Sequence, residues 1–196
     1  MNPCVHYGFS NQILGSMALM ILSCTQRLLL ALLLCFASLV GAQNTSGLPN
    51  PRFTPGRVNP DMTEEVLHGA CHTKGWTRLY RPPVSFTNSL KRLQISKYGY
   101  ENRDPRDYEE DHLVPLCLGG ASEDPGNLWP EPRTGEWNAA VKDKLEAKIC
   151  SLVCAGRVPL KEAQHDVATN WIEAYKKYVE APTFRAHRYK KTYDTQ

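Results

Sequence analysis

An apolar run near the N-terminus, preceded by a single basic residue, most constrains what this chain can become. Arg27 is the only Lys, Arg, Asp or Glu before residue 43, and the run Leu28–Val40 follows it directly. That run is long enough for the hydrophobic region of a signal peptide and too short to span a bilayer comfortably. Val40, Gly41 and Ala42 then supply the small residues that signal peptidase requires. We therefore predict that residues 1–42 are a removed signal peptide, with an uncleaved membrane anchor as the alternative.

Cysteine content supports an exported chain. Four cysteines follow the predicted cleavage site: Cys71, Cys117, Cys150 and Cys154. An even number in an exported domain indicates disulfides. Cys150 and Cys154 are about one helical turn apart, which places them on one face but poorly for bridging each other. We expect the pairs Cys71–Cys154 and Cys117–Cys150. A zinc site that includes His68 and His72 is the alternative, although the chain has no CxxC pair to support it.

Length and composition after residue 42 fit one domain with irregular ends. Residues 43–60 are rich in Gly, Pro, Asn and Ser and lack periodicity, so we predict a flexible lead-in. Residues 61–182 form the predicted domain, and residues 183–196 form a basic, aromatic tail. We expect this domain to be secreted or periplasmic, and to act as a monomer without stable membrane association once the signal peptide is removed.

The charges are unevenly distributed along the chain. The whole chain carries 23 basic and 20 acidic residues, a balance too weak to indicate nucleic-acid binding by itself. Basic residues predominate between Lys74 and Arg106, whereas acids gather in residues 107–111. Basic flanks beside an acidic centre suit a phosphate polymer held against a bound cation, and an ordinary solvated surface is the simpler explanation of the same pattern.

Hydrophobic periodicity predicts an α+β domain. Apolar residues recur every three to four positions from Glu136 to Gly156 and again from Pro159 to Tyr178, the pattern of two amphipathic helices. Thr63 is a candidate N-cap for a short helix that ends near Gly69. The remaining expected elements are an extended segment at 71–83, a helix from Thr87 or Asn88 to Tyr98, and short strands at 111–116 and 127–130.

Residues with hydrolytic potential concentrate at 108–146, in the order strand, loop, strand, helix. Asp111 and His112 lie at the first strand, Asn127 opens the second strand, and Asn138 lies in the first turn of the helix. Hydrolysis of a phosphodiester needs a base for the attacking water, and histidine suits that role near neutral pH. Asp and Asn oxygens are hard ligands that leave positions on a divalent ion open to water and phosphate.

The segments DHLVPLCLGG, NLWP and WNAAVKDKLE resemble the HNH endonuclease motif in its His–Asn–Asn form. The chain after residue 42 also resembles a group of exported bacterial HNH-type proteins, through CHTKGW, RPP, DYEEDHLVPL, NLWPEP, KDKLE and the final helix with AQ, Trp and Tyr. The resemblance implies a small ββα-metal core with an added N-terminal segment and C-terminal helices.

The resemblance also implies a role for each motif residue. Asp111 and Asn138 would bind one divalent ion, Mg²⁺ or Mn²⁺ being preferred and Zn²⁺ or Ni²⁺ possible. His112 would be the general base, and Asn127 would brace the loop that orients it. Asn138 departs from the histidine common at the third position, and Glu136 is an alternative ligand. The cysteine pairs that many HNH proteins use for zinc are missing. The residues expected to contact substrate phosphate are Lys142, Arg81 and Arg106.

We therefore expect a metal-dependent endonuclease that acts on nucleic acid, DNA being favoured over RNA, and leaves 5′-phosphate and 3′-hydroxyl ends. Two alternatives stay open. One is a non-catalytic domain that binds nucleic acid or a protein on the same scaffold. The other is a hydrolase of another polyanionic substrate. An interbacterial toxin with an immunity protein is a variant of the nuclease hypothesis.

Overall fold

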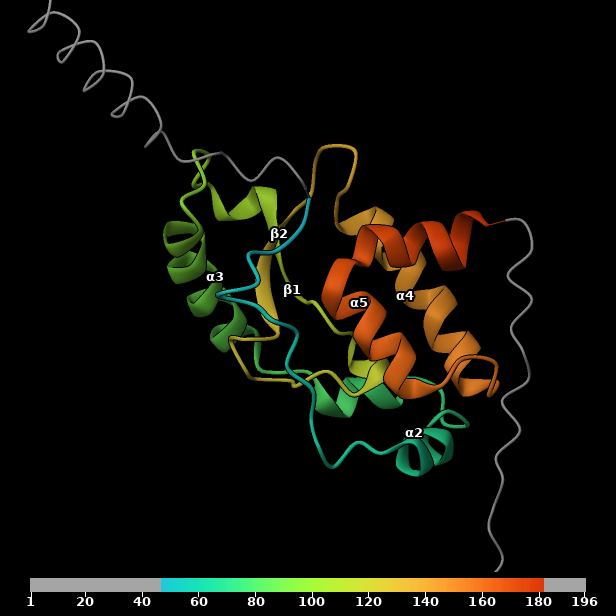
Figure 1. Ribbon diagram of the computed structural model, residues 1–196. Coiled ribbons are helices and arrows are strands. Elements are labelled where there is room, and N and C mark those ends of the chain that lie inside the picture. Colours follow the sequence, from blue (N-terminus) through green and yellow to red (C-terminus); the bar gives the residue numbers. More distant parts are fainter. Residues whose placement is uncertain (1–46, 182–196) are drawn as a thin grey trace, which may run out of the picture. The chain divides into compact units, whose positions relative to one another are not determined.

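The computed structural model describes residues 47–181 (Figure 1). The predicted signal peptide and basic tail lie outside the described residues. Within residues 47–181, no helix is both long enough and apolar enough to cross a membrane.

A two-stranded antiparallel hairpin forms the centre of the described fold. Strands β1 (Tyr108–His112) and β2 (Leu128–Pro132) pair so that Asp111 lies opposite Trp129 and His112 lies opposite Leu128. Since side chains alternate between the two faces of a strand, Asp111 and His112 lie on opposite faces of the hairpin.

Helices lie on both sides of this hairpin, as Figure 1 shows. Helix α3 (Val84–Tyr98) contacts both strands on one side. On the other side, α4 (Ala139–Cys154) follows β2 in the chain and packs against α5 (Leu160–Tyr175). The shorter elements are α2 (Glu64–Ala70), the 3₁₀ turns η1 (Trp76–Tyr80), η2 (Pro105–Asp107) and η3 (Leu116–Leu118), and the π turn η4 (Lys176–Glu180). The predicted α+β class is confirmed: a hairpin followed by helices.

The strand predicted at residues 111–116 was wrong in its position, because β1 spans Tyr108–His112. The strand ends at His112, and η3 begins after Pro115, which has no N–H to donate to a ladder. Leu113, Val114 and Leu118 are fully buried all the same, because they enter the core from a loop. An apolar run bounded by turns does not reveal whether its residues are extended or coiled.

Other predicted boundaries were partly correct. Thr63 caps α2, as expected, by accepting a hydrogen bond from the Val66 N–H. Gly99 ends α3 with φ 72°, a left-handed conformation that glycine adopts without strain. The segment 71–83 is not extended throughout, since it contains η1. Helix α3 starts at Val84 directly after the double proline, not at Thr87.

Both predicted disulfides are confirmed. Cys71 pairs with Cys154 and Cys117 pairs with Cys150, each with 5.8 Å between the Cα atoms. The bonds tie the loop after α2 and the turn η3 to α4. The main core lies between α4, α5 and the loops that these bonds secure, and its largest buried side chains include Trp129, Trp171, Tyr178, Leu145 and Ile149.

The described part of the predicted lead-in, residues 47–60, has bonds to the rest of the domain, and its flexibility stays a prediction. Trp171 Nε1 donates to the Gly47 carbonyl over 2.9 Å, and the Thr54 hydroxyl donates to the Leu128 carbonyl over 3.0 Å. Val58 also forms an isolated antiparallel bridge with Gly120. These contacts join residues that are distant in sequence, so no local periodicity could indicate them.

Candidate functional site

A cavity of about 290 Å³ lies where β1 ends, beside the start of α3. Its lining includes His112 and Asp111 from β1, Arg81 from the residues before α3, and Glu146 from α4. The hairpin, the proline-rich connection and α4 thus bring residues far apart in the sequence to one opening. Three of the sequence-predicted site residues line it: Arg81, Asp111 and His112.

The imidazole of His112 is fixed by a backbone carbonyl. Its Nε2 lies 2.9 Å from the Ser122 oxygen. A carbonyl only accepts hydrogen bonds, so Nε2 carries the proton and the lone pair of the neutral ring resides on Nδ1. Ser122 is itself held, because its hydroxyl donates to the Tyr80 carbonyl. Burial lowers the pKa of His112, outweighing the opposite effects of the Ser122 hydrogen bond and the Asp111 charge, so the ring is neutral at pH 7.

Asn127 holds together the loop between the two strands. Its side-chain oxygen accepts from the Val114 N–H over 2.8 Å, and its amide donates to the carbonyls of Val114 and Ala121. The side chain is fully buried. A methyl group at Gly120 would lie 1.8 Å from the Val114 oxygen, so only glycine allows this loop to close around Asn127. The chain from His112 to Ser122 therefore has one well-defined path.

Asp111 pairs with a buried lysine. Lys142 Nζ lies 2.5 Å from Asp111 Oδ2 and 2.8 Å from the His112 carbonyl oxygen, and it also bonds Glu146 one helical turn along α4. The lysine side chain is only 1% exposed, while the side chains of Asp111 and Glu146 are 23% and 24% exposed. All three N–H donors of the ammonium thus have oxygen partners.

A third carboxyl group joins this cluster from β2. Glu131 is fully buried, and neither of its carboxyl oxygens has a hydrogen-bond partner among the described residues. Burial raises the pKa of Glu131 well above its usual value, so this carboxyl is the neutral acid of the cluster. Burial would raise the pKa of Asp111 as well, but the charge of Lys142 and its hydrogen bond outweigh burial and hold that pKa below its usual value. Asp111 is therefore the ionised partner of Lys142.

The predicted ligands Asp111 and Asn138 do not fit a shared divalent ion. Asn138 is the N-cap of α4: its side-chain oxygen accepts from the Val141 N–H over 3.2 Å, and its amide donates to the Gly135 carbonyl. Asn138 is also absent from the cavity lining. Among residues 47–181, no group of three or more His, Cys, Asp or Glu side chains is arranged to hold a metal ion.

The residues predicted to contact phosphate are in three different environments. Arg81 is exposed and lines the cavity beside His112. Arg106 lies outside the cavity lining, with its side chain 88% exposed and bound to Asp104 at 2.5 Å. Lys142 is buried beneath the cavity. Of these three residues, only Arg81 lines the cavity.

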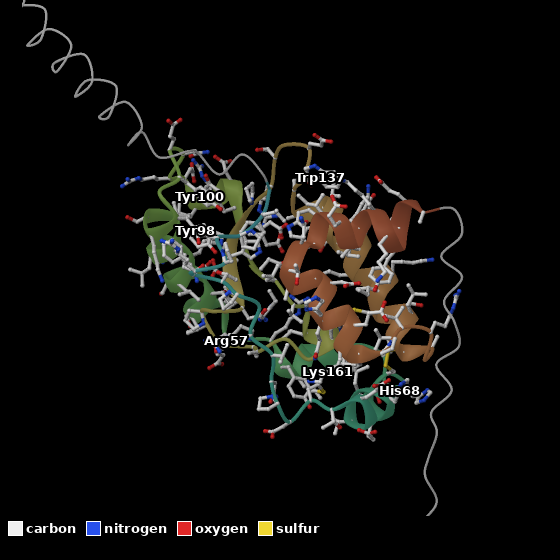
Figure 2. All side chains as sticks on the ribbon, in the orientation of Figure 1. Arg57, His68, Tyr98, Tyr100, Trp137 and Lys161 are labelled. Carbon is white, nitrogen blue, oxygen red and sulfur yellow. A yellow bond between two sulfur atoms is a disulfide. The ribbon has the colours of Figure 1, made fainter. Side chains whose placement is uncertain are left out.

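Glu110 is a site residue that the sequence did not single out. It lines the cavity, and neither of its buried carboxyl oxygens has a hydrogen-bond partner. Burial raises its pKa to about 8. On the same face of β1, Tyr108 stacks on Tyr100 with ring centroids 4.9 Å apart, and Tyr100 lies beside Tyr98 on the α3 side (Figure 2). The burial of the Glu110 carboxyl oxygens next to this aromatic layer favours the neutral acid.

Glu146 lines the cavity but was not predicted as a site residue, although the sequence contained a signal for it. Lys142 and Glu146 are separated by four positions in a predicted helix, the spacing at which opposite charges pair. Glu131 and Ser122 gave no such signal, because their roles depend on how β2 and its preceding loop meet β1.

Comparisons with protein-family models, with curated proteins and with solved structures find no match to this chain. The functional argument therefore depends on the geometry of the site and on the motif resemblance.

Proposed function

We propose that this protein is a hydrolase of phosphodiester bonds in nucleic acid, secreted or periplasmic, with His112 as general base. The observation that carries the proposal is the orientation of His112 at the cavity. A neutral imidazole that donates Nε2–H to a carbonyl presents Nδ1 as its basic atom, the arrangement that activates water.

The order strand, loop, strand, helix agrees with a ββα-metal core, and so does the loop closed by Asn127. In this proposal, Nδ1 of His112 takes a proton from water, and the resulting hydroxide attacks phosphorus. The bond from phosphorus to the O3′ oxygen breaks, and the leaving O3′ takes up a proton from solvent to give the 3′-hydroxyl end. The Arg81 guanidinium binds phosphate oxygens through charge-assisted hydrogen bonds. Asn127 and Ser122 act through His112, by fixing the backbone and the ring.

The two disulfides are typical of an oxidising compartment, which supports the proposed export. Dependence on Mg²⁺ or Mn²⁺ stays a prediction. The contacts of Asp111 and Asn138 do not favour it, so no step here is assigned to a bound ion.

The test is a plasmid-nicking assay on the oxidised protein, in Mg²⁺, in Mn²⁺ and in EDTA, with a single-stranded RNA and a single-stranded DNA as further substrates. Loss of a general base slows a reaction by about 10²–10⁴-fold, so His112→Ala should lose nearly all activity. His165→Ala is the matched control, since His165 is exposed on α5. If the folded protein cleaves no nucleic acid under any of these conditions, the proposal is wrong and the non-catalytic binding domain becomes the better hypothesis.

A further inference from the structure

A positive charge already occupies the place beside Asp111 where the motif resemblance predicts a metal ion. The Lys142 ammonium lies 2.5 Å from Asp111 Oδ2, a hydrogen-bonding distance for a charged pair. The same ammonium contacts the His112 carbonyl oxygen at 2.8 Å. One side chain from α4 therefore binds both residues of the Asp-His pair at the end of β1.

The ammonium is enclosed by acids. Asp111 and Glu146 both bond Lys142, and the buried Glu131 lies diagonally across the hairpin from Asp111. The lysine side chain is 1% exposed, so the oxygens of Asp111, Glu146 and His112 replace the water that an exposed ammonium would bind. Removal of the ammonium would leave the carboxyl groups of Asp111 and Glu146 without their shared cation, and carboxyl oxygens are the donors that hard divalent cations prefer.

The position of α4 explains why the lysine reaches this space. Asn138 starts the helix as its N-cap, and Lys142 follows one turn later, pointing toward the hairpin. The side-chain oxygen of Asn138 is committed to the Val141 N–H. Helix α4 therefore places the Lys142 ammonium beside Asp111. The motif resemblance had predicted that the Asn138 amide oxygen would share a metal ion with Asp111.

We propose that Lys142 is the resident cation of this site, and that Asp111 takes part in the site through a buried ion pair and not as a ligand of a divalent ion. Lys142 is a positioning residue: it balances the charge of Asp111, bonds Glu146 and fixes the backbone at His112. In its catalytic part this inference rests on the proposed function, and it implies that cleavage persists when divalent ions are removed.

The deciding experiment measures Mn²⁺ binding by isothermal titration calorimetry and electron paramagnetic resonance, which need no activity. The oxidised protein and its Asp111→Asn variant are titrated side by side, so that weak binding to surface acids cancels. We expect the two titrations to agree. A Mn²⁺ site in the wild-type protein that weakens tenfold or more in Asp111→Asn would overturn the inference.

The Lys142→Ala variant provides the complementary test. Its vacated space should bind Mn²⁺ at least tenfold more tightly than the wild-type protein does, and Mn²⁺ should raise its Tm. The additional change Glu146→Gln should reverse both effects. Lys148→Ala, an exposed lysine on the same helix, is the control and should match the wild type. A folded Lys142→Ala variant that gains no Mn²⁺ site contradicts the inference. If Lys142→Ala does not fold, the comparison of wild type with Asp111→Asn still decides.

Nicking in EDTA separates this inference from the proposed function. Activity that survives EDTA and is lost in His112→Ala supports both. Activity abolished by EDTA and restored by Mg²⁺ contradicts the resident-cation inference while leaving the hydrolase intact. Absence of all cleavage removes the proposed function, and the Mn²⁺ titrations still judge the role of Lys142.

Discussion

The Nε2 atom of His112 lies 2.9 Å from the carbonyl oxygen of Ser122, ten positions away across the loop that Asn127 closes. This bond fixes the tautomer of the neutral ring and leaves Nδ1 as the proton acceptor. The tautomer of His112, a residue of β1, therefore depends on the path of the loop that leads into β2.

The first prediction concerns the pH dependence of this histidine. Burial lowers the pKa of His112, so the basic neutral form persists to a lower pH than for a free imidazole, whose pKa is about 6.5. Nicking should fall only below that pH, because protonation removes the lone pair of Nδ1. The acidic limb of kcat/KM against pH and the NMR titration of the His112 ring should share one midpoint. A midpoint at or above that of free histidine would refute the burial argument.

Removal of the Asn127 side chain should destabilise the fold. In Asn127→Ala, the buried N–H and C=O of Val114 and the carbonyl of Ala121 lose their partners. Each unsatisfied buried group costs about 1–3 kcal/mol, and we expect a total loss of about 3 kcal/mol or more in the free energy of unfolding. Urea denaturation measures the loss. Asn88→Ala, at an exposed position of α3, is the control, and an equal effect of the two changes would show that Asn127 does not brace the loop.

Gly120 offers a steric test of the same loop. A Cβ at this position would lie 1.8 Å from the Val114 oxygen and 2.6 Å from the Asn127 amide nitrogen. Gly120→Ala must displace backbone, so we expect a loss of about 3 kcal/mol, at the upper end of what overpacking costs. Gly69→Ala is the matched control, because nothing lies within 4 Å of its Cβ and alanine favours the helix α2. Thermal melts should show Gly120→Ala lowered and Gly69→Ala unchanged or raised.

Some of this site was accessible from the sequence. The presence of two disulfides followed from an even cysteine count, and the helical spacing of Cys150 and Cys154 excluded one of the three possible pairings. The choice between the other two pairings was not fixed by any local signal. The order of hairpin and helix followed from turn residues and a change of hydrophobic period. These signals come from residues close together in the sequence, so they can be interpreted without knowledge of the tertiary fold.

The environment of Asp111 was not accessible in that way. The ion pair with Lys142 depends on the distance between β1 and α4, which no spacing in the sequence encodes. The carboxyl of Glu131 belongs to the cluster only because the register of the hairpin sets it diagonally across from Asp111. Asn138 was predicted as a ligand from its position in a motif, whereas its contacts are those of an ordinary N-cap.

The disulfides should contribute unequally to stability. Cys71–Cys154 spans 83 positions and Cys117–Cys150 spans 33. In the chain-entropy model, closing these loops restricts the unfolded chain by about 4.5 and about 3.7 kcal/mol. The double variant Cys71→Ser/Cys154→Ser should therefore have the lower free energy of unfolding of the two double variants. Denaturation in urea under identical conditions ranks them, and the reverse order would mean that strain or residual structure outweighs loop entropy.

A final prediction links the buried carboxyl of Glu110 to stability. Its pKa is raised by burial from 4.5 to about 8 in the folded protein, so the native state binds a proton that the unfolded chain releases. The stability that this group contributes is complete below pH 4.5 and is lost as pH rises through about 8. Glu110→Gln keeps the shape of the side chain and cannot ionise. It should leave the Tm nearly unchanged at pH 5 and raise it, relative to wild type, at pH 9. Glu123→Gln, in the exposed loop between the strands, should have no such pH-dependent effect. Equal Tm differences at both pH values would show that Glu110 is ionised in the folded protein, in which case the aromatic layer of Tyr98, Tyr100 and Tyr108 does not exclude water from it.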